Sequence, residues 1–186
     1  MKNTRIYTYI GIVFLLLPQH VLFAQKVICK QGTISLFSET PMENISAENH
    51  KVVSVLDLGT RQVAVKMTIT DFVFPNKLMQ EHFNENYMES EKHPTAWFTG
   101  KLSGISDFEK NGKQAVFGEG ELMIHGVKRK VKLNGQLEVS EKALVLQANF
   151  TVKPEDYGIE IPSLVITKIA EEIKVSAAFS YTKNAL

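Results

Sequence analysis

The sequence has a single cysteine, Cys29, so it cannot form an internal disulfide. A disulfide-stapled secreted scaffold is therefore excluded, and the hydrophobic core must stabilise the fold. An excess of either charge is also missing, because 21 Lys and Arg residues are set against 20 Asp and Glu residues. Neither a basic patch nor a basic amphipathic helix stands out, so we expect neither nucleic acid nor an anionic membrane surface as a partner. Nothing in the sequence indicates a protein partner.

The motifs of common enzymes are missing as well. There is no Gly-x-Ser-x-Gly elbow and no glycine-rich phosphate-binding loop. Glu81, Glu85 and Glu89 recur every four residues, which is more typical of a solvated helix face than of an acid–base pair. We therefore expect no catalytic residues and no cofactor, and a protein that is not an enzyme.

The histidines do not show a metal-ligand spacing. His82 and Glu85 lie one helical turn apart, but a metal site needs a third ligand in a fixed geometry. His50, His93 and His125 belong to other segments and form no His-x-x-x-His pattern. The sequence therefore predicts no metal site.

Residues 1–24 have the features of a secretory signal peptide. Lys2 and Arg5 precede an apolar run at 10–17, Pro18 interrupts it, and Ala24 suits the last position before cleavage. The run is too short for an ordinary membrane span, although a retained anchor is the alternative. We expect residues 25–186 to form one exported domain, periplasmic or secreted.

Apolar and polar residues alternate along most of the remaining chain, which indicates strands with one buried face. Glycines, prolines and an Asn111-Gly112 hairpin signal separate the strands, a pattern typical of an antiparallel barrel or sandwich. The expected strands lie near residues 33–37, 51–58, 62–69, 95–103, 115–124, 127–139, 144–152 and 173–181.

One stretch departs from this alternation. In residues 76–89, Met79, Phe83 and Tyr87 are four residues apart, which places them on one face of a short α-helix. Asn76 suits its N-cap, and Pro94 prevents its continuation. A further helical turn is expected within residues 41–49.

Aromatic residues gather around this helix and the following strand. Phe83 and Tyr87 lie on the helix, whereas Trp97 and Phe98 open the strand. They form either part of a packed core or the wall of an apolar cavity, because a barrel of about eight strands holds side chains or one small ligand. The sequence leaves both alternatives open.

Two segments carry a resemblance to a known family. The segment HFNENYMESEKHPTAWF (82–98) resembles a stretch of the YceI-like polyisoprenoid-binding family with a histidine, an aromatic pair and acidic-Lys-Tyr-Pro, in which His93 takes the place of the tyrosine. The segment GEGELMIHGVKRKVKL (118–133) resembles the family's Ile-His-Gly-Val signature. The N-terminal half diverges, since Met79-Gln80-Glu81 stands where the family has Arg-Asp.

The resemblance implies an all-β, antiparallel, eight-stranded barrel like that of a lipocalin, which holds an isoprenoid or similar lipid as an exported carrier or scavenger. A packed barrel acting as a stress or interaction protein is the alternative, and a lipid-modifying enzyme a more distant one. The residues expected to line the cavity are Phe83, Tyr87, Trp97, Phe98, Leu122, Ile124, Phe150 and Phe179. Among these, Trp97 is included only as a candidate for the rim, because it alternates with Phe98.

The signal peptide leads to the first testable prediction. Intact-mass measurement of the protein from its native host should give a mature chain that begins at Gln25, because Ala24 is the expected last residue before cleavage. A mass that includes the first 24 residues would show that the segment is retained and would favour the anchor.

Overall fold

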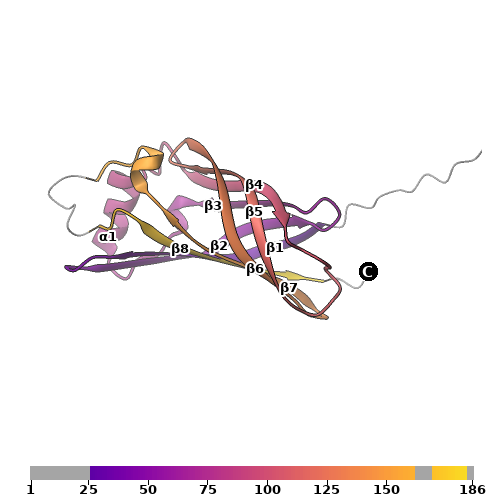
Figure 1. Cartoon of the computed structure of the whole chain (residues 1–186). Helices are drawn as coiled ribbons and strands as arrows, with labels where there is room; N and C mark the ends of the chain where they lie inside the picture. The colour runs from indigo at the N-terminus through magenta and orange to yellow at the C-terminus, as the bar shows by residue number, and fades with distance from the viewer. Residues whose placement is uncertain (1–25, 162–168, 184–186) are drawn as a thin grey trace, which may run out of the picture.

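The computed structural model describes residues 26–161 and 169–183, so the expected signal peptide lies outside the described residues. Eight strands form a closed barrel in which each strand pairs antiparallel with the next and β8 pairs back with β1 (Figure 1). The expected eight-stranded antiparallel barrel is confirmed. The strands are β1 (Lys26–Glu39), β2 (Asn44–Asp57), β3 (Gln62–Thr68), β4 (Thr95–Ser103), β5 (Gly112–Ile124), β6 (Val127–Val139), β7 (Ala143–Val152) and β8 (Ile173–Thr182).

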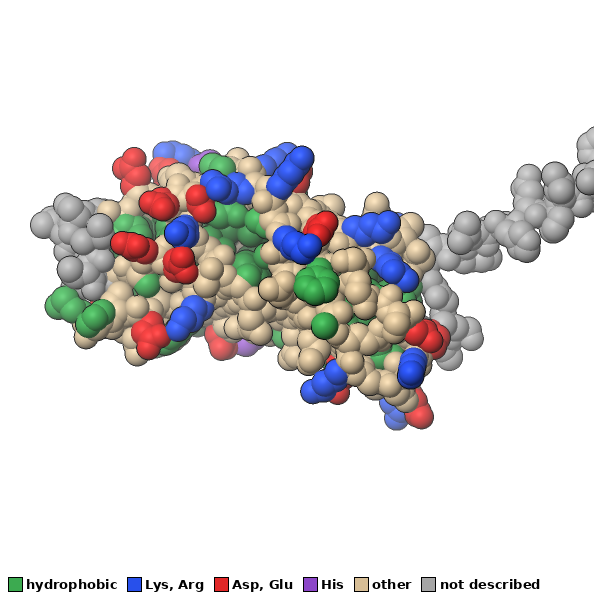
Figure 2. Space-filling model, in the orientation of Figure 1, with side chains coloured by type: hydrophobic (Ala, Val, Ile, Leu, Met, Phe, Trp, Pro, Cys, Tyr) green, Lys and Arg blue, Asp and Glu red, His purple; other side chains and the backbone are tan. Residues whose placement is uncertain are grey.

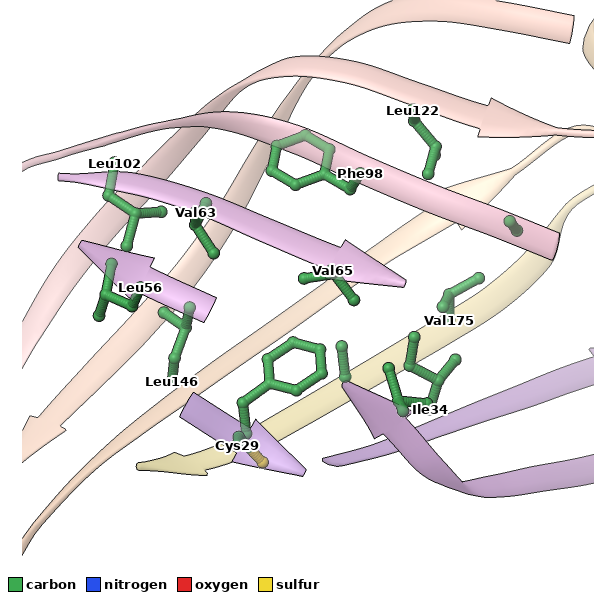
Figure 3. Packing of buried hydrophobic residues seen from close by; sticks show 14 of the residues in the cluster. Cys29, Ile34, Leu56, Val63, Val65, Phe98, Leu102, Leu122, Leu146 and Val175 are labelled. Carbon is green, nitrogen blue, oxygen red and sulfur yellow. The ribbon is translucent and has the colours of Figure 1, made fainter. Parts of the chain in front are cut away.

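The alternating pattern of the sequence sets which side chains face the interior. Side chains of Val63 and Val65 in β3, Leu146 in β7 and Val175 in β8 project into the barrel (Figure 3). The residues between them face solvent, where cationic and anionic side chains are interspersed on the face in Figure 2. No single-sign charge patch is present on that face.

The expected helix is present near the predicted residues but changes character along its length. It begins as α1 (Lys77–His82) and continues as a π-helical turn, η2 (Phe83–Tyr87), at one end of the barrel (Figure 1). The predicted N-cap is confirmed, because the Asn76 side chain accepts a 2.9 Å hydrogen bond from the backbone N–H of Leu78. Within the described residues, no helix combines the length and apolarity that a transmembrane segment requires.

Two 3₁₀ turns complete the described elements, η1 (Ile69–Asp71) and η3 (Pro154–Tyr157). The helical turn expected within residues 41–49 is wrong. Residues 44–49 belong to β2, where Asn44 pairs with Glu39 of β1 across a tight connection. Pairing with a neighbouring strand here overrides the local preference of a polar, turn-forming sequence.

The half of the barrel away from α1 is filled by side chains. Two phenyl rings lie against strand glycines: Phe98 over Gly100, and Phe179 over Gly32. A Cβ atom on Gly32 would lie 2.4 Å from Cδ1 of Phe179, and one on Gly100 would lie 2.7 Å from Cζ of Phe98. Only glycine permits such close approach, so these rings can pack directly against the backbone of the wall.

A polar pair is buried within this packed half. The Ser54 and Tyr181 hydroxyls lie 2.6 Å apart, and both residues are fully buried. Burial raises the pKa of Tyr181 above its ordinary value, so the phenol keeps its proton and can donate or accept in this bond. The bond satisfies two hydroxyls that water does not reach.

This pair gives a prediction about stability. Tyr181→Phe should lower the free energy of unfolding by about 1–3 kcal/mol, because it leaves the buried Ser54 hydroxyl without its partner. Urea denaturation of the mature protein measures the change. The double variant Ser54→Ala/Tyr181→Phe is the control. Its loss in the free energy of unfolding should be smaller than the sum of the losses of the two single variants, because no unpaired hydroxyl then remains buried. Simple additivity would contradict the coupling.

Candidate functional site

The half of the barrel next to α1 contains an apolar cavity of about 440 Å³. Its wall comes from the ends of the strands that meet at this end, from η1 and from the helix that covers them. The lining residues are Ile34, Leu36, Ser38, Glu43, Ile45, Ala47, Met67, Ile69, Phe72, Phe74, Asn76, Leu78, Met79, His82, Phe83, Tyr87, Met88, Ala96, Leu122, Ile124, Phe150, Val152, Pro154, Ile159, Ile161, Ile169, Ile173 and Val175.

Aromatic packing holds the helix over the cavity. The Phe83 ring lies 5.6 Å from that of Phe72 in an edge-on arrangement and 4.9 Å from that of Phe74, measured between centroids. These two phenylalanines follow η1, and the backbone of Val73 between them pairs with Glu48 of β2. The segment before α1 is thereby fixed to the barrel, and α1 with it.

Most of the residues expected to face the cavity do line it. Phe83, Tyr87, Leu122, Ile124 and Phe150 are part of its wall. Their contact with a ligand stays a prediction.

Three expected residues lie elsewhere. Trp97 is on the outer face, where the Lys128 ammonium lies 5.2 Å from the centre of its ring, so it is not a cavity residue. Phe98 and Phe179 point inward but are packed in the filled half, below the cavity. Neither residue lines the observed cavity, because the two rings pack against strand glycines.

Sequence reasoning missed a large part of the wall. Phe72 and Phe74 come from a segment outside the expected strands and helix. Ile34, Leu36 and Ile69 lie in expected strands but are absent from the expected cavity residues. A signal was present in both cases, since apolar residues alternate at 34 and 36 and again at 72 and 74.

Three of the polar lining residues lie toward solvent, whereas Ser38 is buried. Asn76 and His82 are exposed and Glu43 is half-buried, whereas the deeper wall is aliphatic and aromatic. Leu78 lines the cavity although 57% of its surface is exposed, so the cavity opens beside α1. Partial burial raises the pKa of Tyr87, which keeps the phenol neutral within the wall.

A separate polar cluster adjoins the cavity on the outside. Ligand-capable atoms of Glu89, His93 and His125 lie within 4.8 Å of one another. The expectation that these histidines are scattered is therefore wrong, because the barrel brings the turn before β4 against the turn between β5 and β6.

Solved structures share this fold. A polyisoprenoid-binding domain from Saccharophagus degradans, implicated in plant cell wall breakdown, aligns with a TM-score of 0.73 at 12% identity, over 86% of this chain and 98% of its own. BcnA of Burkholderia cenocepacia aligns with a TM-score of 0.68 at 12% identity, over 80% and 95%. The YceI protein of Campylobacter jejuni gives 0.56 at 15% identity, over the full length of both chains.

These low identities show the fold alone. No curated protein sequence matches the chain. The family model of the YceI-like domain, however, matches residues 28–181, which include all eight strands except the first two residues of β1 and the last of β8. With this match over most of its length, the chain belongs to the YceI-like family.

Proposed function

We propose that this protein is an exported carrier or scavenger that binds the hydrocarbon chain of an isoprenoid or similar lipid inside its barrel. The observation that supports this function is the apolar cavity of about 440 Å³. Ligand pockets commonly have volumes of about 300–1,000 Å³ and a mostly apolar lining. A barrel packed along its whole length, the alternative function, would contain no such space.

The size of the cavity limits the part of a lipid that it can enclose. At the packing density of protein interiors, about 0.74, a volume of 440 Å³ accommodates roughly 15–20 carbon atoms of a hydrocarbon chain. This corresponds to roughly three or four isoprene units at that density. Phe98 and Phe179 fill the space below, so a longer chain must extend out of the opening beside α1.

Burial of such a chain provides enough free energy for binding without any reaction chemistry. Each CH₂ group removed from water contributes about 0.8 kcal/mol, so 15 carbons contribute roughly 12 kcal/mol before the costs of association. Those costs are at least about 4 kcal/mol, which leaves roughly the −8 kcal/mol of a micromolar complex.

The polar lining residues indicate which end of a ligand enters last. Glu43, Asn76 and His82 lie at the opening, and the deeper described wall holds no charged side chain that would compensate a buried charge. Its buried hydroxyl, that of Ser38, already accepts a hydrogen bond from the backbone N–H of Ala170. We infer that the tail enters first and that the headgroup stays near α1. A titratable cluster suited to lipid chemistry is not found among the described lining residues, which favours binding over catalysis.

Point variants test whether Phe83 and Tyr87 contact a bound ligand or only stabilise the hydrophobic core. Phe83→Gln and Tyr87→Gln should each weaken binding of a fluorescent isoprenoid probe at least tenfold, because a polar amide replaces an apolar contact with the ligand. Probe fluorescence measures affinity, and urea denaturation measures stability in parallel. Phe117→Gln is the matched control: Phe117 is 39% exposed and absent from the lining. Equal losses of affinity and stability would show that these residues serve the core alone.

Chain length provides an independent measurement. In a series of isoprenoid and linear alcohols competing with the probe, affinity should rise by about fourfold per added CH₂ group. The rise should level off at roughly 15–20 carbons, when the cavity is full. Calorimetric titration checks the values. A steady rise well beyond this length would contradict a cavity closed by Phe98 and Phe179, and the absence of any binding would exclude the carrier function.

A further inference from the structure

The cluster outside the cavity is built from two turns that pack together. Glu89 and His93 flank one turn, in which the His93 N–H donates a 2.9 Å hydrogen bond to the Glu89 carbonyl. His125 occupies the turn between β5 and β6. The His93 and His125 rings meet edge-on with their centres 4.4 Å apart.

His125 is held in a defined orientation. Its Nδ1 atom lies 3.2 Å from the backbone carbonyl oxygen of Tyr157, which can only accept a hydrogen bond. Nδ1 therefore carries the hydrogen, and in the neutral ring the lone pair belongs to Nε2. Histidines that bind metals usually have this arrangement, with the second ring nitrogen donating to a carbonyl or carboxylate.

Nε2 points at the carboxylate of Glu89, so in the neutral ring its lone pair faces that carboxylate. Nε2 is buried and makes no hydrogen bond within the described part of the chain, and Oε2 of Glu89 lies 3.3 Å away. Two acceptor atoms at this distance repel each other unless a positive charge lies between them, either a proton on Nε2 or a metal ion. A ring nitrogen of His93 also lies beside these two atoms, although an ion pair between Glu89 and His125 does not need a third group.

The carboxylate of Glu89 is available in its charged form. Its Oε1 atom is bound by the Lys92 ammonium, and Oε2 is directed at His125. The Lys92 hydrogen bond and charge hold the pKa of Glu89 below its ordinary value.

The geometry of the three donors suits a small ion. Ligand atoms at about 2.0–2.1 Å from a tetrahedral zinc ion lie about 3.4 Å apart. The pair formed by Glu89 and His125 already has this separation, and all three donors lie within 4.8 Å. Gly126 allows His93 to come close, because a Cβ atom on Gly126 would lie 3.0 Å from the His93 ring.

We propose that Glu89, His93 and His125 bind a divalent transition-metal ion, with zinc as the ion best suited to two imidazoles and one carboxylate. Three protein ligands leave a fourth position for water. The ion would cross-link the turn that follows Tyr87 and Met88 to the turn that follows Ile124. All three of these residues line the cavity, so the metal would stiffen one side of its wall.

Metal titration of the untagged, chelator-treated protein tests this site. Calorimetric titration with Zn²⁺ should show one ion bound per protein molecule. Co²⁺ in the same site should give the visible absorption of tetrahedral coordination by nitrogen and oxygen. His93→Tyr and Glu89→Gln should each weaken Zn²⁺ binding at least tenfold. His93→Tyr introduces the residue that the resembling family segment has at this position, and it leaves the His125 bond to Tyr157 intact.

An exposed pair of the same chemistry provides the control. His50 Nε2 lies 3.0 Å from Glu48 Oε2 without a second histidine, so His50→Ala should leave Zn²⁺ binding unchanged. If wild type binds no Zn²⁺, or if His93→Tyr binds it as tightly as wild type, the cluster is a Glu89–His125 ion pair and the proposal is wrong. Circular dichroism of each variant verifies the fold, and the titration is independent of lipid, so its failure leaves the proposed carrier function untouched.

Discussion

The packing of two phenyl rings onto strand glycines determines what this barrel can contain. Phe98 and Phe179 pack directly against Gly100 and Gly32, and together with the aliphatic core they fill the half away from α1. The remaining side chains toward α1 do not reach one another across the barrel, and a cavity of about 440 Å³ is left. The depth of the cavity, and so the length of any chain it accepts, depends on where these rings stop.

The helix and the segment before it then decide how the cavity meets solvent. Phe72 and Phe74 contact Phe83 from below, while the exposed Leu78 marks the opening. The aromatic contacts hold the helix on the barrel, and Asn76 and His82, which also line the cavity, are exposed. In the proposed carrier, an apolar tail would enter past α1, and a polar headgroup would meet solvent and polar side chains at the entrance.

The sequence predicted the strands and the helix well because both depend on local periodicity. Alternation in β3, β7 and β8 assigned the inward faces correctly, and spacing by four identified Met79, Phe83 and Tyr87. Periodicity specifies the face of a residue but not its height in the barrel, which is why Phe98 was placed in the cavity wall. The glycines beneath the ring carry that information, but only once the neighbouring strands are in register. The contact between Glu89 and His125 could not be predicted from the sequence either, because only the closed barrel brings their two turns together. Both residues adopt positive φ angles in these turns, 41° and 52°.

The cavity and the polar cluster share the same short segments of chain. In one turn, Met88 lines the cavity and its neighbour Glu89 belongs to the polar cluster. In the other, Ile124 lines the cavity and its neighbour His125 belongs to the cluster. A positive charge between Glu89 and His125, whether proton or metal, draws the two turns together and with them the two cavity-lining neighbours. A proton bridges only that pair, whereas a metal also recruits His93 and fixes both ends of its turn. In the proposed site, the rigidity of this side of the wall therefore depends on which cation bridges the cluster.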